Sequence, residues 1–379
     1  MADQALAPGR VKVPFVDLSL SHGPIGPALL ADIATLINEG AFTNGPQVAE
    51  FEAAFAEYCG TAHCVGLASG LDALRLALIA SGIVPGDEVI VPANTFIATF
   101  EAISQAGGRP VPVDVSESDL ELDVEAASSA ITPRTRFLMP VHLHGQLTDM
   151  SRLRRLAGRH DLQIVEDAAQ AHGAERDGLR AGAAGTAGAF SFYPSKNLGA
   201  FGDAGAVCTD RSELAEHVHA LREHGQRRKY VHDLEGYTAR LDTIQALVLL
   251  HKLPFLDAWN DERRQVAGLY LEALDGVGDL DLPPVPEGSN PVWHLFVIRT
   301  RDPSALGDFL AERGISTARH YPQPAHLSEA YARLGYTRGA FPVAEALADR
   351  CLSLPIYPGI SHAQLEAVVS AVGDFFHVG

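Results

Sequence analysis

The sequence predicts an α/β protein built on a mostly parallel, doubly wound sheet. Short apolar runs alternate with amphipathic stretches of helical length, and glycine or serine follows several of these runs. Strands that alternate with helices of this length are typical of a parallel sheet, because each helix returns the chain to the edge at which the next strand begins. The apolar runs lie at residues 64–68, 88–91, 110–113, 137–141 and 163–166, and the amphipathic stretches lie at 72–81, 95–106 and 150–160.

The rest of the chain predicts the completion of this domain and a second, smaller one. Two more strands are expected at 188–192 and 205–209, on either side of a polar loop rich in glycine. A long helix is expected over 242–259, followed by a strand at 293–298 and helices over 304–313 and 362–376. We therefore predict an N-terminal arm (1–45), a large domain (46–255) and a small C-terminal domain (256–379).

Composition and charge narrow the classes of function. With 47% hydrophobic and 20% charged residues among 379, the chain has the balance of a globular enzyme. A formal net charge of −18 argues against nucleic acid as a general partner, because phosphate backbones are bound by clustered lysines and arginines. Basic runs at 152–155 and 227–229 leave one local anion site open, although a solvated helix face or loop explains them as well.

The sequence gives no sign of a membrane segment or a secretion signal. No run approaches the roughly 20 apolar residues that span a bilayer. Residues 1–10 lack both a basic start and an apolar signal core. We therefore expect a cytoplasmic protein without a membrane partner.

Metal and nicotinamide sites are weakly supported. The four cysteines are scattered without a C-x-x-C pair, which favours reduced, mostly buried thiols. His142 and His144 alternate on an expected strand and His172 lies elsewhere, but packing or ligand contacts explain them better than a metal, so we predict no metal. No G-x-G-x-x-G follows an early strand, which leaves a dinucleotide-binding enzyme with little support.

The first motif with chemical content is the turn at Ser69, Gly70 and Leu71, where a strand ends and a helix begins. Gly70 permits a tight turn, and the free N–H groups of the first helical turn form an anion site that suits one phosphate. An ordinary turn with Ser69 as the helix N-cap is equally compatible with these residues.

The second motif is an apolar strand that ends in Glu166 and Asp167. A cofactor that stabilises a carbanion through a protonated ring nitrogen needs a fixed, desolvated carboxylate beside that nitrogen, and Asp167 is placed for this role. A helix cap is the alternative interpretation of Asp167.

The third motif is Lys196, in the glycine-rich loop between the strands at 188–192 and 205–209. A lysine forms an imine only when part of its population is neutral, and partial burial lowers its pKa enough to allow this. Most loop lysines are simply solvated, so this interpretation depends on the neighbouring motifs.

Together these segments resemble the DegT-type family of nucleotide-sugar aminotransferases, which depend on pyridoxal 5′-phosphate (PLP) and have fold type I. The resemblance covers nearly the whole chain and includes the segments at 92–99, 166–173, 240–246 and 317–322. It implies a large domain with a mostly parallel sheet flanked by helices, and a smaller C-terminal α/β domain. It also implies a homodimer with its active sites at the subunit interface.

The resemblance implies a role for each matching residue of the cofactor site. Lys196 carries the cofactor as a Schiff base and moves the proton, Asp167 pairs with the ring nitrogen, and Gln170 approaches the ring hydroxyl. Phe96 stacks on the ring, and Ser191 holds the phosphate.

The phosphate site departs from the commonest family pattern at two positions. The turn of Ser69, Gly70 and Leu71 also holds the phosphate, but Leu71 stands where many relatives have threonine, so one hydroxyl is lost while the backbone N–H remains. Thr238 stands where relatives usually have an asparagine that reaches the neighbouring subunit's phosphate, so this contact comes from Thr238 or is lost.

The implied reaction is transfer of an amino group from L-glutamate to C3 of a dTDP-linked 3-keto-6-deoxyhexose, with pyridoxamine 5′-phosphate (PMP) as the intermediate form of the cofactor. Transfer to C4 of a related 4-keto sugar is the alternative, and a PLP-dependent sugar dehydratase is a weaker one, because its relatives replace the lysine or add a cysteine cluster. Candidate contacts to the sugar or its diphosphate, each with a structural role as the alternative, are Lys229, Tyr230, His320, Tyr321 and His326.

Overall fold

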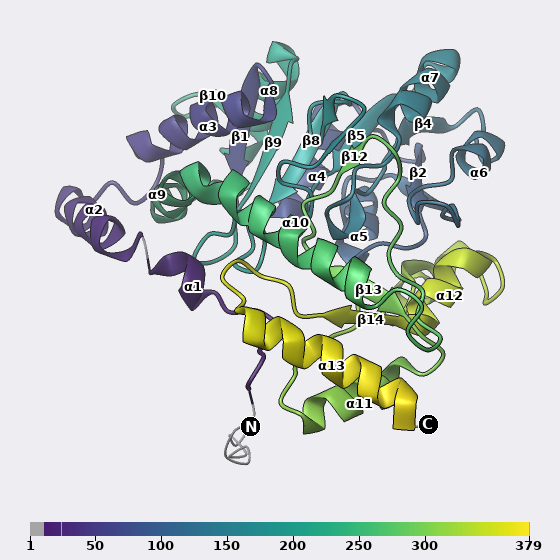
Figure 1. Ribbon diagram of the computed structural model, residues 1–379. Helices are drawn as coiled ribbons and strands as arrows, with labels where there is room; N and C mark the ends of the chain where they lie inside the picture. The colour runs from purple at the N-terminus through teal and green to yellow at the C-terminus, as the bar shows by residue number, and fades with distance from the viewer. Residues whose placement is uncertain (1–10, 24, 379) are drawn as a thin grey trace.

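The computed structural model describes residues 11–23 and 25–378, and its centre is a seven-stranded sheet (Figure 1). Each of the seven predicted strands is present, with ends that differ by up to three residues from the prediction. In spatial order the strands are β1 (His63–Leu67), β9 (Gly205–Thr209), β8 (Ala187–Ser191), β5 (Gln163–Asp167), β4 (Thr135–Leu138), β2 (Glu88–Pro92) and β3 (Arg109–Val113).

The sheet is parallel apart from one strand. The pairs β8–β5, β5–β4, β4–β2 and β2–β3 are parallel, whereas β9 is antiparallel to both of its neighbours, β1 and β8. The predicted mostly parallel α/β fold is therefore confirmed. Its carboxyl edge, where parallel strands end together, is the expected place for a ligand.

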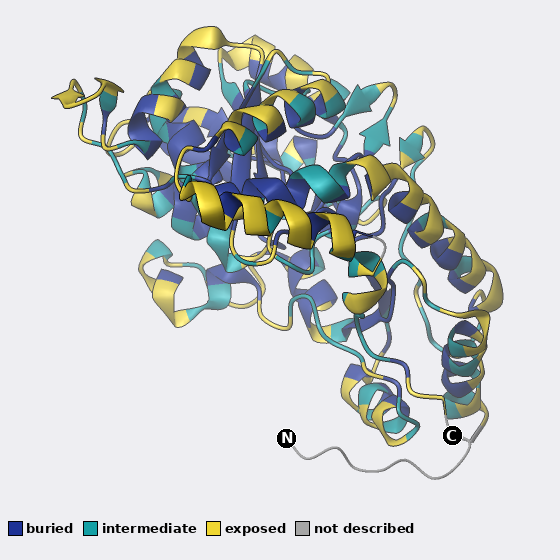
Figure 2. Cartoon of the chain, turned by 90° about the vertical axis from the view of Figure 1, so that its left-hand side faces the viewer, coloured by how far each residue is buried: buried dark blue, intermediate teal, exposed yellow. Residues whose placement is uncertain are grey.

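Helices cover both faces of the sheet because residues along each strand alternate between two apolar cores. Ile90 joins the core under one set of helices, whereas its neighbours Val89 and Val91 join the core under the other. Figure 2 shows the buried strands between helices whose outer faces are exposed. The first set is α3 (Pro46–Cys59), α6 (Val124–Ser129), α7 (Met150–His160) and α9 (Thr243–Lys252), and the second is α4 (Gly70–Ala80), α5 (Ile97–Gln105) and α8 (Ser212–Arg222).

A third apolar core lies in the C-terminal part of the chain. The helix α10 (Leu256–Ala273) links it to the sheet, because Leu256 packs in one of the two cores beside the sheet whereas Val266 and Tyr270 pack in the third core. The helix thus begins at the proposed boundary of 255/256, and its first residue still packs in the core that lies under α3 and α9. Around this core lie β13 (Phe296–Arg299) and β14 (Cys351–Leu354), which pair antiparallel, with α11 (Pro303–Glu312), α12 (Pro342–Arg350) and α13 (His362–Val378).

The start of the described chain also packs there, since Val13 is buried in the third core and pairs with Ile315. Residues 1–10 of the proposed arm lie outside the described residues. In the described segments, no helix is both long enough and apolar enough to cross a membrane.

The remaining elements are α1 (Ser19–His22), α2 (Gly26–Glu39), β6 (Glu175–Arg176), β7 (Leu179–Arg180), β10 (Gln226–Arg228), β11 (Val231–His232), β12 (Ser289–Asn290) and the short 3₁₀ turns at Leu143–Gly145, Leu253–Phe255, Ala325–Leu327 and Glu329–Leu334.

The predicted helix over 242–259 is wrong as a single element. The chain forms α9, a 3₁₀ turn at Leu253–Phe255 and then α10. Pro254 lies in that turn, and a proline removes a helical N–H donor and crowds the preceding turn. The predicted strand at 293–298 likewise begins later, at Phe296, because Trp293 has a left-handed backbone with φ of 46°.

Candidate active site

A cavity of about 510 Å³ lies where β1, β2, β5 and β8 end. Its walls come from the turns that follow these strands, from the loop that holds Lys196 and from the C-terminal part of the chain. The lining residues are Ser69, Gly70, Leu71, Leu74, Thr95, Phe96, Ala98, Val141, Leu143, Asp167, Ala169, Gln170, Ser191, Tyr193, Ser195, Lys196, Asp203, His294, His320 and Tyr321.

One wall is the turn between β1 and α4, which packs tightly against the end of β8. Ser69 is the N-cap of α4, because its hydroxyl oxygen accepts a hydrogen bond from Asp72 N at 3.0 Å. A side chain on Gly70 would place its Cβ 2.6 Å from Ser191 Cβ, so only glycine allows this approach. Ser69 is therefore a helix N-cap, which was the alternative interpretation of this turn. The first turn of α4 still directs its N–H groups and the positive end of its dipole toward the cavity wall.

The loop after β8 holds Lys196 in the cavity. Lys196 N donates to Tyr193 O at 2.8 Å, and the next residue, Asn197, donates through its side chain to Asn260 Oδ1 and Val292 O, both at 2.8 Å. Burial lowers the pKa of Lys196 to about 8, although the nearby carboxylate of Asp167 opposes this shift. A fraction of the amine is therefore neutral near neutral pH, as imine chemistry requires.

Asp167 ends β5 and faces the same cavity with only 6% of its surface exposed. Its Oδ2 accepts a hydrogen bond from Thr99 Oγ1 at 2.8 Å, and its Oδ1 accepts one from Ala169 N at 3.2 Å. Burial raises the pKa of Asp167, whereas these two hydrogen bonds and the Lys196 charge act in the opposite direction. The carboxylate is thus fixed in orientation, and its neighbours counteract part of the rise in pKa that burial causes.

Gln170 links the turn after β4 to the C-terminal part of the chain across the cavity. Its Oε1 accepts a hydrogen bond from His144 N at 2.7 Å, and its Nε2 donates to Tyr321 Oη at 3.1 Å. The ring of Phe96, with 49% of its surface exposed, lies 5.2 Å from that of Tyr321. His320 lines the same wall, with Nδ1 2.8 Å from Ser353 Oγ, and burial lowers its pKa to about 4.

Three predicted contact residues lie away from this cavity. Lys229 and Tyr230 occupy the turn of the β10–β11 hairpin, where Tyr230 is 80% exposed and the Lys229 ammonium lies 5.3 Å from its ring centroid. Thr238 follows the hairpin, and its hydroxyl contacts the ring of His224 at 3.2 Å. Within one chain the structure therefore does not bring these residues to the lysine.

His326 does not lie in the cavity either, and its predicted contact with the sugar is corrected here. Its side chain is 1% exposed, bonds to Glu345 Oε1 at 3.1 Å and packs edge-on against the Phe341 ring at 4.7 Å. A ring with an internal partner and no exposed face cannot contact a ligand in this cavity.

The histidines considered for a metal site are separated in the structure. His142 bonds through Nε2 to Glu166 Oε2 at 2.9 Å, and His172 packs between Phe190 and Phe192 with ring separations of 5.4 and 5.6 Å. Among the described residues no three metal-ligating side chains cluster together.

Sequence reasoning missed several residues of the cavity. Thr99, which bonds Asp167, lies in the first turn of α5, four residues after Thr95, which precedes the helix, and the two hydroxyls are 2.7 Å apart. This i, i+4 threonine pair just beyond a strand end was a detectable signal. Asp203, which lines the cavity from the glycine-rich loop, and His294, which lies just before β13, were also missed.

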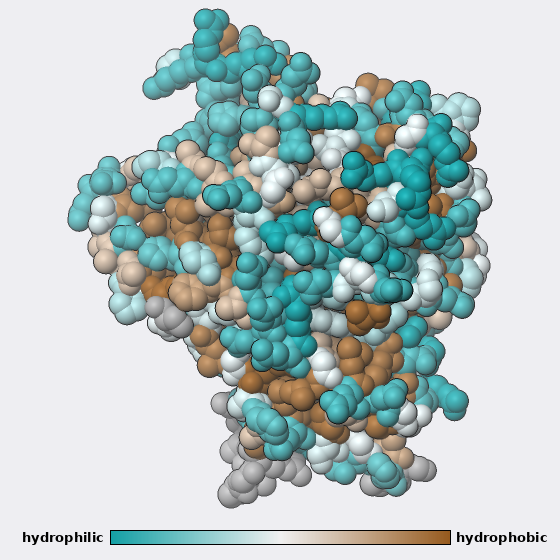
Figure 3. Space-filling model, turned by 45° about the horizontal axis from the view of Figure 1, so that its top comes forward, coloured by the Kyte–Doolittle hydropathy of each residue, from teal (hydrophilic) through white to brown (hydrophobic). Residues whose placement is uncertain are grey.

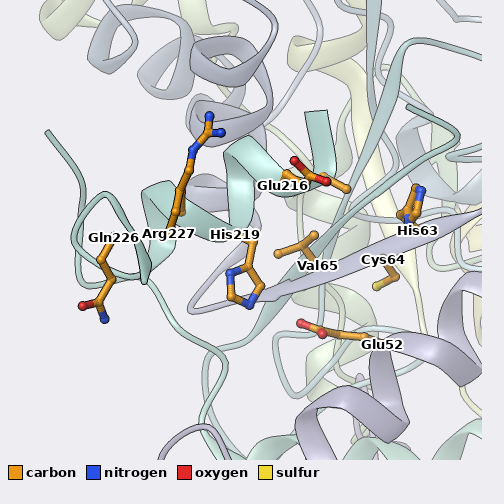
Figure 4. A pocket seen from close by; sticks show the side chains of 10 residues that line it. Glu52, His63, Cys64, Val65, Glu216, His219, Gln226 and Arg227 are labelled. Carbon is orange, nitrogen blue, oxygen red and sulfur yellow. The ribbon is translucent and has the colours of Figure 1, made fainter. Parts of the chain in front are cut away.

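A second hollow of about 360 Å³ is lined by residues of α3, β1, α8 and β10 (Figure 4). It shares no lining residue with the first cavity. Arg227 of the basic run lies at its rim, but Glu52 and Glu216 line it as well, so it offers mixed charge rather than an anion site. No lysine is among the residues that line it.

The hydroxyl of Thr99 gives a first testable prediction. Thr99→Val removes a donor to a buried carboxylate, so the pKa of Asp167 rises further and the acidic limb of the activity profile moves to higher pH, with a loss of about tenfold near neutral pH. Thr99→Ser keeps the hydroxyl and restores the profile. Rates measured across pH for the three proteins test this, and an unchanged profile in Thr99→Val contradicts it.

The fold and this cavity define an α/β aminotransferase. A crystal structure of DesV from S. venezuelae in complex with a ketimine intermediate superimposes with a TM-score of 0.94 at 49% identity, covering 96% of this chain and 98% of that one. A crystal structure of NtdA from Bacillus subtilis with bound cofactor PMP matches with a TM-score of 0.89 at 31% identity, over 97% of this chain and 85% of that one.

The chain belongs to the DegT/DnrJ/EryC1/StrS aminotransferase family, whose model matches residues 25–373. It is similar to the dTDP-3-amino-3,4,6-trideoxy-α-D-glucose transaminase of Streptomyces venezuelae, with 49% identity over 364 residues, or 96% of each chain.

Proposed function

We propose that this enzyme transfers an amino group, taken from L-glutamate, to C3 of a dTDP-linked 3-keto-6-deoxyhexose, with PLP as its cofactor. The observation that carries the proposal is a lysine with a pKa of about 8 that faces a buried carboxylate in one cavity. The similarity to a transaminase named for a dTDP-3-amino sugar supports the choice of substrate.

The residues of the cavity fit this cofactor. Lys196 supplies the amine for the cofactor's aldehyde carbon, and Asp167 supplies a fixed anion for its ring nitrogen. The close approach of Gly70 to Ser191, which a Cβ would block, leaves a cradle at the start of α4 that suits a phosphate. Phe96 and Gln170 are left to contact the ring and its hydroxyl.

When bound, PLP supplies an electron sink for the electron pair left on carbon after a proton is removed. Lys196 acts as the base that takes this proton and returns it at the neighbouring carbon, because its amine is partly neutral and lies inside the cavity. Asp167 is fixed by its bonds to Thr99 and Ala169, which also oppose the rise in its pKa, and it would face the positively charged ring nitrogen of the cofactor.

The partial neutrality of Lys196 gives a second prediction. Since burial depresses its pKa, the reactive amine accumulates as pH rises through about 8 rather than 10.5. The rate at which protein stripped of cofactor takes up PLP should therefore rise with pH up to a plateau with a midpoint near 8. Stopped-flow absorbance measures this rate, and a midpoint above 10 contradicts the prediction.

A homodimer would complete the site. Two exposed aromatic side chains, Phe96 and Tyr193, lie among the residues that line the cavity. Phe201, which shares the loop between β8 and β9 with Tyr193, is also exposed. Figure 3 shows apolar side chains gathered in several patches on one face of the molecule. We propose that a second copy covers this rim, so that Thr238 and the hairpin of Lys229 and Tyr230 reach the partner's cavity.

Nitrogen transfer tests the proposed function directly. The holoenzyme is incubated with ¹⁵N-labelled L-glutamate and the dTDP-linked 3-keto sugar, and the product is examined by mass spectrometry and NMR. Label on C3 is the expected result. Label on C4 of a 4-keto sugar supports the alternative regiochemistry, and loss of oxygen without label supports a dehydratase.

A further inference from the structure

His294 lies in the small domain, just before β13, and its ring reaches the same cavity as Lys196. Its backbone is held from behind by the buried Arg263, whose Nη1 donates to the carbonyl oxygens of Trp293, His294 and Ile356 at 3.2, 3.4 and 2.9 Å. A ring held this firmly offers a fixed polar atom to any ligand in the cavity.

The hydrogen-bond network determines which nitrogen of His294 carries the proton. Asn260 Nδ2 donates to His172 O at 2.9 Å, which fixes the orientation of this amide. Asn260 Oδ1 therefore accepts a hydrogen bond from Asn197 Nδ2 at 2.8 Å. Asn197 Nδ2 also donates to Val292 O, which leaves Asn197 Oδ1 to face His294 Nδ1 at 3.1 Å. Since an amide oxygen only accepts, His294 Nδ1 is the donor.

The other nitrogen, Nε2, is therefore an acceptor in the neutral ring. Burial and the nearby positive charges of Lys196 and Arg263 lower the pKa of His294 well below 6.5, which keeps the ring neutral. Within the described part of the chain, Nε2 has no hydrogen-bond partner, so it is left for a ligand.

We propose that His294 Nε2 accepts a hydrogen bond from a hydroxyl group of the sugar substrate. A neutral nitrogen with a lone pair attracts O–H donors and repels carboxylate and phosphate oxygens, so it favours the hydroxylated sugar ring over the carboxylates of the amino donor. Asn197, next to Lys196, is a positioning residue that fixes this tautomer. The inference rests on the proposed function, because it concerns the second substrate of that reaction.

Measuring the two half-reactions separately distinguishes a contact between His294 and the sugar from an effect of His294 on Lys196. His294→Phe and His294→Gln are made in the full-length holoenzyme, and each half-reaction is followed by stopped-flow absorbance in single turnovers. Binding of the dTDP-linked amino sugar is measured separately by calorimetry. The matched control is His219→Phe, a histidine of the second hollow (Figure 4).

The expected result is that His294→Phe weakens sugar affinity about 10- to 100-fold in both assays and leaves the glutamate half-reaction within about threefold of the parent. His294→Gln, whose side-chain oxygen can accept in place of Nε2, recovers most of the loss. Unchanged sugar affinity overturns the inference, and so does a parallel loss in both half-reactions. If the parent protein shows no glutamate half-reaction, the proposed function itself fails and takes the inference with it.

Discussion

Lys196→Ala is expected to lower the rate of amino transfer by at least about 10⁴-fold, because one side chain supplies both the covalent anchor of the cofactor and the proton-transfer group. Thermal unfolding shows whether the fold is retained, and bound PMP is quantified after denaturation. We expect PMP to stay bound, since the phosphate cradle at Gly70 and the carboxylate of Asp167 are untouched.

Lys196→Arg is the matched variant for this experiment. It keeps a positive charge in the cavity but cannot become a neutral amine, so it is expected to lose activity to the same extent. Measurable turnover in Lys196→Ala, or activity in Lys196→Arg, contradicts the assignment of Lys196 as the reacting amine.

Asp167→Asn is expected to reduce turnover by about 10²- to 10⁴-fold, because a neutral amide of the same shape cannot hold the positive charge on the cofactor ring. Ala169 N bonds to Oδ1 and the Thr99 hydroxyl bonds to Oδ2, so the single amide oxygen of asparagine can keep one of these two hydrogen bonds. With that oxygen at Ala169 N, the amide NH2 can donate to the Thr99 hydroxyl oxygen, which keeps the side chain in place, so the loss reports mainly charge. Steady-state rates with L-glutamate and the keto sugar give the measurement.

The control for this variant is Asp203→Asn, which removes a second carboxylate from the same cavity. Asp203 is exposed and lies in the glycine-rich loop between β8 and β9, so its loss is expected to cost far less activity. Equal losses in the two variants would mean that total charge in the cavity, not the position of Asp167, determines the rate.

The fold was largely predictable because the strands are buried on both faces and so appear as short apolar runs. The run at 163–166 predicted β5 and placed Asp167 at its end, which the structure confirms. The helix over 242–259 was wrong because its apolar periodicity continues across Pro254, and only the missing N–H donor of that proline shows the break.

The contacts within the site were less predictable, because they join residues distant in the sequence. Thr99 lies 68 positions from Asp167, and His294 lies 97 positions from Asn197. Each appears as an ordinary polar residue until the fold brings it to its partner. His326 shows the converse, since its burial against Glu345 could not be inferred from its position in a polar segment.

The absorption spectrum of the protein reconstituted with PLP is the measurement that tests the central claim most directly. The visible band of the lysine-bound cofactor is expected to disappear when L-glutamate is added and to return when a dTDP-linked 3-keto-6-deoxyhexose follows. Loss of the band without its return would leave an aminotransferase that acts on a different keto substrate. The absence of any such band after reconstitution would contradict the account of Lys196 and of the site built around it.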